Sequence, residues 1–447
     1  MIQDLELIKK EIKYDKTLNC VQCGYCLPVC PTYITMGKET HSPRGRINLV
    51  KMVGEGKMTD LSIMEEPMDL CLGCRACETA CPTGVQYGEI LEGARSVMKK
   101  SKKSPMLQTI LLSKVIPSHK MMEQAGNAFW LYEKSGMQTM LRKSGLLDKL
   151  PAHLGTFESI IPAAVSPKER ARFPKRVQME SPGVMAQTGT DQNGEKREKK
   201  YTVAFFTGCI MDAMFRRINQ LSVELLAKAG CEVVMMENQT CCGALHAHTG
   251  DMKESKKLAK QNIAAFEKEN VDFIVNNAGG CGAMLKEYDR LLEDEPEWLE
   301  RAKEFTEKNK DISEVLVLCG GIPVINHPPE KVTYQRSCHM TNVQKVKIEP
   351  VQLIKSIPNV ELIEMNEGDM CCGSAGIYNI VNYEASMEIL DRKMGNVKDT
   401  LATTILTTNP GCLLQMKLGV KREGLTQKVR VLHLVEFLAE AAGVSSW

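Results

Sequence analysis

The sequence predicts an α+β protein of several domains, in which a small, mainly helical N-terminal module precedes two copies of an α/β domain. Two cysteine patterns indicate this arrangement: one four-cysteine motif occurs twice in the first hundred residues, and a different pattern occurs twice after residue 200. Strand-like and helix-like segments alternate around the second pattern, which is typical of a parallel sheet with crossover helices. The length of 447 residues is sufficient for two to four domains.

The composition is that of an ordinary globular protein, with 43% hydrophobic and 25% charged residues. A formal net charge of +2 gives no indication of nucleic-acid binding. The first ten residues contain acidic side chains where a signal peptide has its apolar core. The longest strongly apolar stretch, 315–325, is far shorter than a membrane-spanning helix. We therefore expect neither secretion nor membrane insertion.

Both N-terminal motifs read C-x2-C-x2-C-x3-C-P, and they are offset by 51 residues at all four positions. Bacterial ferredoxins bind [4Fe–4S] clusters with this spacing, and the fourth cysteine of each motif binds the other cluster. A pair of zinc sites is the alternative, but zinc sites normally use two separated C-x2-C pairs. We predict two [4Fe–4S] clusters, the first bound by Cys20, Cys23, Cys26 and Cys81, and the second by Cys71, Cys74, Cys77 and Cys30.

Residues 1–100 are therefore predicted to form a two-cluster, ferredoxin-type domain. Between the motifs, the apolar residues from Ile47 to Val53 follow helical spacing, and Gly54 is suitable for ending a helix. The absence of a β-hairpin pattern there favours an α-helical module over a β-rich one. In the same segment, Arg44 and Arg46 are candidates for contact with an anionic cluster, although a solvated helix face explains them equally well.

The second cysteine pattern repeats with offsets of 129 to 131 residues, and such a constant period indicates duplication of a whole domain. In each copy a glycine follows a cysteine pair, which gives a C-C-G motif. We predict one such CCG domain at 201–325 and the other at 326–447. Their cysteines are Cys209, Cys241, Cys242 and Cys281 in the first copy, and Cys338, Cys371, Cys372 and Cys412 in the second.

Strand-like segments precede the cysteines of both copies, so we expect the thiols at the carboxyl ends of parallel strands, where such sheets bind ligands. Two further cysteines, Cys231 and Cys319, lie in apolar runs and are predicted to be buried small hydrophobic residues. The expected strands are at 201–208, 231–240 and 271–280 in the first copy, and at 331–337, 360–370 and 403–411 in the second.

Two further segments separate the N-terminal module from the duplicated half. Residues 101–164 are predicted to form a basic helical connector, because seven basic and only two acidic side chains occur between 101 and 145. Such a connector either packs against the chain's own domains, which we favour, or contacts a membrane surface or a partner. Residues 165–200 are charged, contain Pro and Gly, and are predicted to be a flexible linker.

At these residues the chain resembles the iron–sulfur subunits of bacterial glycolate oxidase, also called glycolate dehydrogenase. The segments CVQCGYCLPVCPTY, SPRGRINLVKMVGEG and CLGCRACETACPTGVQYG carry the resemblance, together with the two CCG domains. The resemblance implies an electron-transfer subunit that relays electrons from a partner FAD subunit, which oxidises glycolate to glyoxylate, towards a quinone or another carrier. Related subunits of anaerobic glycerol-3-phosphate dehydrogenase, lactate oxidation and heterodisulfide reductase are the alternatives.

One departure separates the chain from heterodisulfide reductase, whose CCG domains end in C-x2-C and use five cysteines for an unusual cluster. The matching earlier positions here are Ala278 and Asn409, so each copy offers four thiolates. Four thiolates suit a cubane cluster or a zinc ion. We expect at least one further iron–sulfur cluster in the CCG domains, with zinc or an empty site as the alternative in the other copy.

No dinucleotide-binding glycine motif and no P-loop occur in the sequence, so the flavin and the substrate are expected on another subunit. We therefore expect no catalytic residue in this chain. A redox sensor without a catalytic partner is the alternative from a different class. His246, His248 and His339 are candidate ligands near the CCG motifs, but surface histidines are the favoured interpretation. The expected location is the cytoplasm, with peripheral contact with the inner face of the cell membrane left open.

Overall fold

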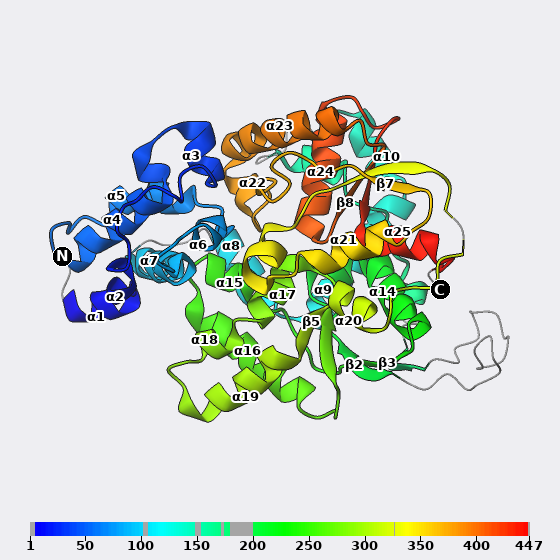
Figure 1. Ribbon diagram of the computed structural model, residues 1–447, viewed down its shortest axis with the longest axis horizontal. Helices are drawn as coiled ribbons and strands as arrows, with labels where there is room; N and C mark the ends of the chain where they lie inside the picture. Colours follow the sequence, from blue (N-terminus) through cyan, green and yellow to red (C-terminus); the bar gives the residue numbers. More distant parts are fainter. Residues whose placement is uncertain are drawn as a thin grey trace.

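The computed structural model describes residues 5–101, 106–147, 153–170, 174–178, 200–325 and 327–445. The chain forms a helical N-terminal module, a helical connector and two α/β halves that lie against each other (Figure 1). The α+β, multidomain fold class predicted from the sequence is thus confirmed. The division of the chain at residues 100, 164, 200 and 325 remains a prediction.

The N-terminal module contains only helices between residues 5 and 101, as predicted. The central helix, α4 (Pro43–Gly54), begins where Ser42 accepts a hydrogen bond from the backbone of Gly45 and Pro43 occupies the first turn. Its buried face includes Ile47, Val50 and Val53, which follow the predicted spacing. The other helices are α1 (Leu5–Glu11), α2 (Tyr14–Thr17), α3 (Pro31–Met36), the 3₁₀ turn η1 (Glu39–His41), α5 (Ser62–Asp69), α6 (Ala76–Thr79) and α7 (Tyr87–Ser101).

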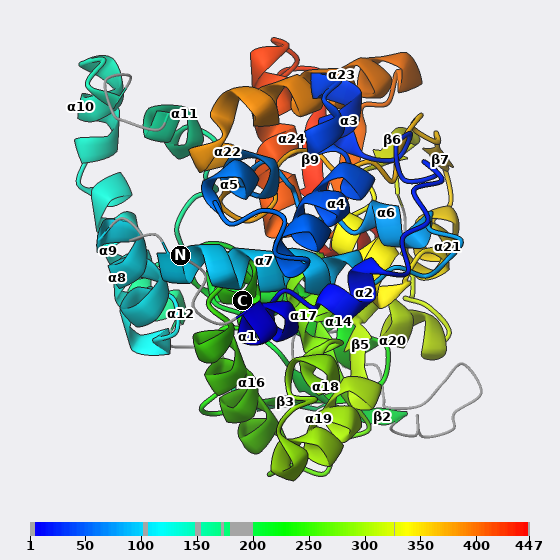
Figure 2. The same cartoon turned by 90° about the vertical axis from the view of Figure 1, so that its left-hand side faces the viewer.

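The connector lies along one side of the molecule (Figure 2). Its longest helix, α9 (His119–Lys134), packs against the first α/β half, yet several apolar side chains of the connector, among them Met106, Leu131 and Met140, are exposed. Throughout the described part of the chain, no helix has the length and apolar character needed to cross a bilayer. The remaining connector elements are α8 (Met106–Ile110), the π-helical turn η2 (Leu111–Val115), α10 (Met137–Lys143) and α11 (Leu154–Glu158). Helix α12 (Pro167–Arg170) follows within the range predicted as a linker.

The first α/β half contains a five-stranded sheet of order β1-β3-β2-β4-β5, in which all neighbours are parallel except β1 and β3. Three of the strands coincide with predicted segments: β2 (Tyr201–Phe205), β3 (Cys231–Met235) and β4 (Phe273–Asn276). The other elements are β1 (Arg176–Val177), α13 (Ile210–Met214), α14 (Arg216–Lys228), α15 (Ala244–His248), α16 (Met252–Phe266), α17 (Gly279–Leu285), α18 (Tyr288–Leu291), α19 (Pro296–Lys308), β5 (Asn309–Asp311) and α20 (Ile312–Leu318).

The second half repeats this order in a fully parallel sheet, β7-β6-β8-β9. Its predicted strands are β6 (Glu330–Tyr334), β7 (Val360–Leu362) and β8 (Thr404–Thr407). Because both halves share one strand order, the structure agrees with the predicted duplication. The other elements are the π-helical turn η5 (Met340–Gln344), α21 (Ile348–Lys355), α22 (Tyr378–Val381), α23 (Tyr383–Thr400), α24 (Pro410–Arg422), β9 (Arg430–His433) and α25 (Leu434–Ala441).

Three edge strands were not predicted from the sequence. Strands β5 and β9 are short and close the far edge of each sheet, and β5 reads Asn-Lys-Asp, which carries no strand pattern. Strand β1 lies within the range predicted as a linker and pairs with β3 through two residues, Arg176 and Val177. Residues 171–173 and 179–199 of that range lie outside the described residues, so the linker prediction is tested only at its beginning.

The two halves meet in a symmetrical manner. Helix α14, between β2 and β3, packs against α25, which follows β9. Its counterpart α21, between β6 and β7, packs against α20, which follows β5. Leu225 of α14 and Phe437 of α25 are fully buried members of one apolar cluster that extends through both sheets. The two halves therefore share a core, although each has its own sheet.

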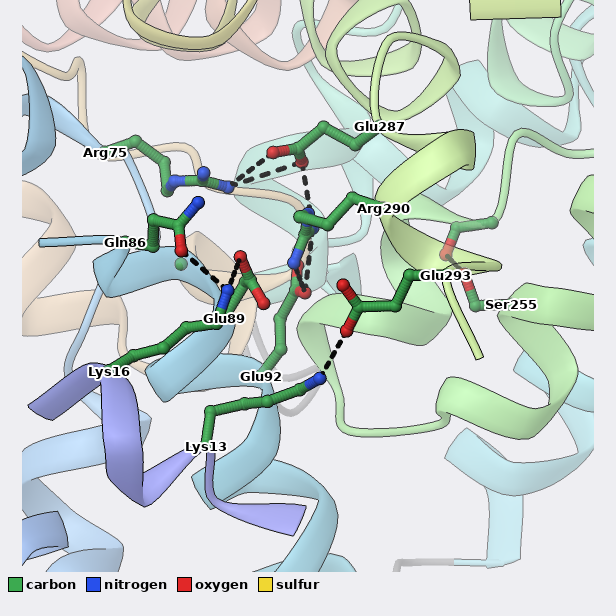
Figure 3. Close-up of polar contacts among 12 residues, drawn as sticks. Lys13, Lys16, Arg75, Gln86, Glu89, Glu92, Ser255, Glu287, Arg290 and Glu293 are labelled. Carbon is green, nitrogen blue, oxygen red and sulfur yellow. Dashed lines mark hydrogen bonds and ion pairs between the residues drawn. The ribbon is translucent and has the colours of Figure 1, made fainter. Parts of the chain in front are cut away.

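Buried ion pairs hold the N-terminal module against the first half (Figure 3). The Nη1 and Nη2 atoms of Arg290 lie 3.0 and 3.1 Å from Glu92 Oε2 on α7, and Nη2 also lies 3.1 Å from Glu287 Oε2. Arg75 Nη1 lies 3.0 Å from Glu287 Oε1. Burial opposes the charge of Arg290, but the carboxylates of Glu92 and Glu287 raise its pKa above the ordinary value.

Replacement of Arg290 by alanine is expected to reduce the free energy of unfolding by about 3–5 kcal/mol, because Glu92 and Glu287 would remain buried with fewer partners. Arg422→Ala is the matched control, since the pair of Arg422 with Asp391 is exposed and should contribute less than about 1 kcal/mol. Anaerobic urea unfolding, followed by far-ultraviolet circular dichroism, measures both losses. Equal losses in the two variants would contradict the stabilising role of the buried pairs.

Candidate iron–sulfur sites

The first group of predicted ligands surrounds a cavity of about 30 Å³ in the N-terminal module. Cys20, Cys23, Cys26 and Cys81 line this cavity, as does Cys77. Gln22 and Gly24 adopt left-handed backbone conformations, with φ of 59° and 89°, which allow the chain to turn tightly between successive cysteines. The fourth member, Cys81, comes from the other motif and approaches from the end of α6.

The second group lines a cavity of about 20 Å³ formed by Cys30, Cys71, Cys74 and Cys77. Each fourth cysteine therefore lies beside the first three cysteines of the other motif. The structure brings together the same two groups of four that the sequence analysis proposes, and iron is the chemistry that such thiol groups suit. The assignment of each cysteine to a particular cluster remains a prediction.

A buried guanidinium, that of Arg46, borders the second group. Its side chain is only 1% exposed, and it donates to the carbonyl of Pro67 (2.6 Å) and to Thr32 Oγ1 (3.1 Å). Burial alone would lower the pKa of Arg46, but negative charge on Cys71 and Cys30 raises it. The interpretation of Arg46 as part of a solvated helix face is therefore wrong, because the residue faces the cysteines.

Cys71 receives more stabilisation of its thiolate than its neighbours do. The hydroxyl of Tyr87 donates to Cys71 Sγ over 3.3 Å, and the backbone N–H of Gly73 donates over 3.4 Å. Burial would raise the pKa of Cys71, but these donors and the charges of Arg46 and Arg95 lower it. Sequence analysis did not single out Tyr87, because it lies outside both motifs and no spacing rule connects it to a cysteine.

Other thiols of the second group lack this compensation. Burial raises the pKa values of Cys74 and Cys77 well above the ordinary value. Metal binding requires thiolates, so these two cysteines would bind iron with release of protons. The protein surroundings therefore stabilise the thiolate of Cys71, whereas Cys74 and Cys77 would become thiolates only when they bind iron.

In both CCG domains the four cysteines lie together at the carboxyl ends of the parallel strands, as predicted. In the first half the sulfur atoms of Cys209 and Cys241 are 3.6 Å apart, and contacts continue through Cys242 to Cys281. The second half has the same succession of contacts, which runs through Cys338, Cys371, Cys372 and Cys412.

The glycine of each CCG motif is required because the surrounding atoms leave no room for a side chain. Gly243 and Gly373 have φ of 89° and 91°, and a Cβ atom at either position would lie 2.8 Å from Ser255 Oγ or Ser386 O. Each of these serines donates a hydrogen bond to the glycine carbonyl of its own motif. Both loops are therefore fixed in the same way, and a residue with a side chain would move the cysteine pair.

The donor chemistry of the CCG groups fits an iron–sulfur cluster. Within the described residues, no three or more His, Cys, Asp or Glu side chains are arranged around one point as ligands of a single metal ion. The thiolates of a cubane bind separate iron atoms, so they need not converge in that way. At the fifth-ligand positions, Ala278 is buried and Asn409 donates from Nδ2 to Cys412 Sγ over 3.7 Å.

The second ferredoxin-type group lies next to the second CCG group. Cys74, Cys338 and Cys371 belong to one small apolar cluster with Leu72 and Tyr378. Asn342, just after Cys338, donates to the carbonyl of Cys74 over 2.9 Å and accepts from Thr79 over 2.9 Å. These contacts place the two cysteine groups on either side of one boundary between the N-terminal module and the second half.

Of the histidines near the CCG motifs, His246 is not a surface residue, contrary to the favoured interpretation, and His248 and His339 are half-buried. His246 is fully buried and its Nε2 lies 2.7 Å from the carbonyl of Leu112 in the connector. His248 and His339, one from each half, have ring centres 5.3 Å apart. Burial lowers the pKa of His248 to about 4, so this ring is neutral at physiological pH.

Cys231 and Cys319 are buried, as predicted, and lie away from the four groups. Their sulfur atoms are 3.5 Å apart, between the beginning of β3 and the end of α20. This contact joins two elements of the first half. It provides a useful comparison for the other cysteines, because it is a thiol pair in the core with no further cysteine in the contact.

Comparisons with protein families match four segments of the chain. A 4Fe-4S dicluster domain matches residues 16–85, and the cysteine-rich CCG domain matches twice, at 203–286 and 332–417. The linker region of the glycolate oxidase iron-sulfur subunit matches residues 103–161, which correspond to the connector. These matches support iron–sulfur clusters as cofactors.

Similar proteins extend over almost the whole chain. The probable glycolate oxidase iron-sulfur subunit of Bacillus subtilis (strain 168) is 48% identical over 442 residues, which cover 97% of this chain and 96% of that protein. The glycolate oxidase iron-sulfur subunit of Escherichia coli (strain K12) is 27% identical over 94% of this chain and 93% of its own length. Lactate utilization protein A of Oceanobacillus iheyensis is 35% identical over 53% of this chain and 96% of its own length. With these cysteine groups, this domain order and this identity, the chain belongs to the family of glycolate oxidase iron–sulfur subunits.

Proposed function

We propose that the chain is the electron-transfer subunit of a glycolate oxidase complex. The observation that carries the proposal is the contact between two thiol groups: the second ferredoxin-type group borders the second CCG group through Cys74, Cys338 and Cys371. Electron transfer between centres requires such proximity, whereas a structural metal site does not. The full-length similarity to subunits named for glycolate oxidase supports glycolate as the substrate of the complex.

The proposed cofactors are two [4Fe–4S] clusters in the N-terminal module. Cys20, Cys23, Cys26 and Cys81 would hold the first, and the second would be held by Cys30, Cys71, Cys74 and Cys77. A bound cluster of this kind supplies one-electron oxidation and reduction. The four thiols of each CCG domain, Cys209, Cys241, Cys242 and Cys281, and Cys338, Cys371, Cys372 and Cys412, would hold a further iron–sulfur cluster, with zinc as the alternative in one copy.

The surrounding residues would tune the second site of the N-terminal module. Tyr87 and Gly73 donate hydrogen bonds to Cys71 Sγ, and hydrogen bonds to ligand sulfurs raise the reduction potential of such sites. The buried charge of Arg46 acts in the same direction, because it favours the more negative, reduced state. The buried position of Cys71 and Cys77 excludes water from this side.

The chemistry of glycolate itself is assigned to a partner. Conversion of glycolate to glyoxylate releases two electrons and two protons, which is flavin chemistry. The sequence has no dinucleotide-binding motif, which supports an FAD-binding dehydrogenase subunit as the electron donor. The final acceptor would be a quinone or another carrier, and the complex would work in the cytoplasm, either free or at the inner face of the cell membrane.

Lactate oxidation is the second candidate, because lactate utilization protein A is 35% identical over about half of this chain. The full-length relatives favour glycolate. The two candidates differ in the flavin subunit with which the chain assembles, so comparison of glycolate, L-lactate and glycerol 3-phosphate as reductants separates them.

To test the proposal, the chain is co-expressed with the FAD-binding dehydrogenase of the same organism, and the complex is purified without oxygen. Anaerobic addition of glycolate should bleach the visible absorption of the chain and produce electron paramagnetic resonance signals of reduced clusters. L-lactate and glycerol 3-phosphate should have little effect. A complex that forms but stays oxidised with glycolate would contradict the proposed function.

The cluster ligands are tested by metal analysis of alanine variants. Cys74→Ala should reduce the iron content by about four atoms per chain, because one cubane loses a ligand. Cys231→Ala is the control, since Cys231 is a fully buried cysteine that has only Cys319 beside it. Unchanged iron in Cys74→Ala, or an equal loss in Cys231→Ala, would refute the assignment.

The content of the CCG domains is determined with a third variant in the same series. Cys372→Ala should remove iron if the second copy holds a cluster, and zinc if it holds a single ion. The N-terminal clusters should keep their iron and their spectra in this variant. A protein whose metal content does not change after this replacement would show that the second copy binds no metal through Cys372.

A further inference from the structure

A cavity of about 410 Å³ lies where the N-terminal module meets both CCG domains. Its walls come from five separate segments: the region 69–72 before α6, the second half of α7, the turn η2 of the connector, α15 and the residue after it, and the segment 375–382 of the second half. Its volume is within the range of small-molecule sites, which is about 300–1,000 Å³. The two small cavities that the N-terminal cysteines surround are separate from it.

The walls of this acceptor cavity, as we name it, are more apolar than polar, and their polar members are Asp69, Arg95, Lys99, His248, Thr249 and Asn382. Leu72 comes from the N-terminal module, Leu112 from the connector, Leu245 from the first half, and Ile377 and Val381 from the second. Leu245 lies close to the segment 375–377: a Cβ atom at Gly376 would be only 3.1 Å from Leu245 Cδ2. An apolar, flat molecule fits such walls better than a strongly hydrated one.

A buried hydroxyl lies beside the cavity. Tyr378 lines the wall and is only 4% exposed, and its buried hydroxyl has no hydrogen-bond partner among the described residues. A buried polar atom without a partner is costly unless a ligand or water satisfies it. The two cations of the wall are already engaged, since Arg95 donates to the carbonyls of Cys71 and His248, and Lys99 pairs with Asp251.

Two of the thiol groups lie at this cavity. Cys71, of the second ferredoxin-type group, forms part of the wall. Tyr378 lies in the same apolar cluster as Cys338 and Cys371 of the second CCG group. An occupant would therefore touch one proposed electron-transfer site directly and lie one side chain from another.

We propose that the acceptor cavity binds a quinone, as the electron acceptor of the chain. A quinone has an apolar ring and two carbonyl oxygens that accept but do not donate, which matches apolar walls with a free hydroxyl donor. This inference rests on the proposed function, because that function supplies the electrons. The quinone gains two electrons, which arrive one at a time through the chain, and two protons from solvent, and becomes the quinol. Glycolate oxidation releases the same number of electrons and protons.

The cavity is tested first by binding and labelling, without the partner subunit. The purified chain is incubated anaerobically with a photoreactive azidoquinone, illuminated, and digested for mass spectrometry. The label should attach to peptides that contain residues 245–249 or 375–382, and an excess of unlabelled short-chain quinone should prevent it. Labelling confined to other peptides, or labelling that the competitor does not reduce, would overturn the proposal.

Two variants test the walls and the donor. Leu245→Trp fills the space beside the segment 375–377 and should weaken quinone binding at least tenfold. Tyr378→Phe removes only the hydroxyl and should weaken it about five- to tenfold, the equivalent of one hydrogen bond. Binding of decylbenzene, which has no carbonyl, should be unchanged in Tyr378→Phe. The matched control is Leu318→Trp, at an exposed leucine of α20 that does not line the cavity.

Electron transfer distinguishes a failure of this inference from a failure of the proposed function. Chain reduced with dithionite should be reoxidised by quinone at least tenfold more slowly in Leu245→Trp than in the wild type or Leu318→Trp. With glycolate and the flavin subunit, all variants should still be reduced at the wild-type rate, with normal iron content and circular dichroism. Equal quinone binding and equal reoxidation in Leu245→Trp would refute the acceptor cavity, whereas wild-type chain that glycolate does not reduce would refute the proposed function alone.

Discussion

Negative charge inside the protein is the constraint on which the rest of the structure depends. Sixteen thiols lie in four groups, and thiolates in a dry interior are stable only beside compensating charge or hydrogen-bond donors. The chain supplies both at the second ferredoxin-type group, where Arg46 is buried beside Cys71 and Cys30 and where Tyr87 donates to Cys71. The burial of an arginine in a small helical module is explained by this need.

The duplicated half meets the same constraint with backbone geometry. Its cysteines follow the ends of parallel strands, and a glycine with positive φ turns the chain after each cysteine pair. Symmetrical packing of α14 with α25 and of α20 with α21 brings the two halves together. Their carboxyl edges consequently lie near enough for His248 and His339 to approach each other and for the N-terminal module to contact both.

Much of this arrangement could be predicted from the sequence, because it depends on spacing within the chain. The cysteine motifs, helix α4 and the strands β2, β3, β4, β6, β7 and β8 follow local patterns of period or repeat, and the structure contains them where they were expected. The edge strands β1, β5 and β9 were not predicted: β1 has only two residues in a charged segment, and β5 reads Asn-Lys-Asp, which carries no strand pattern. Their pairing is decided by the neighbouring strand, not by their own sequence.

The surroundings of the sites were less predictable for a related reason. The burial of Arg46 and His246 depends on segments distant in sequence, such as Pro67 and Leu112, so no local pattern indicates it. The same holds for Tyr378, which joins the second half to the N-terminal module. The ligand groups themselves are different, because each fourth cysteine is tied to a motif whose spacing is known from ferredoxins.

Because the two halves share a core, loss of either half would affect the other. Leu225 and Phe437 lie in one apolar cluster that neither half could close alone, since each covers the helices of the other. A chain that lacked one of the two copies would expose a large apolar surface to water. The two copies are therefore not independent of each other, because each covers helices that would otherwise be exposed.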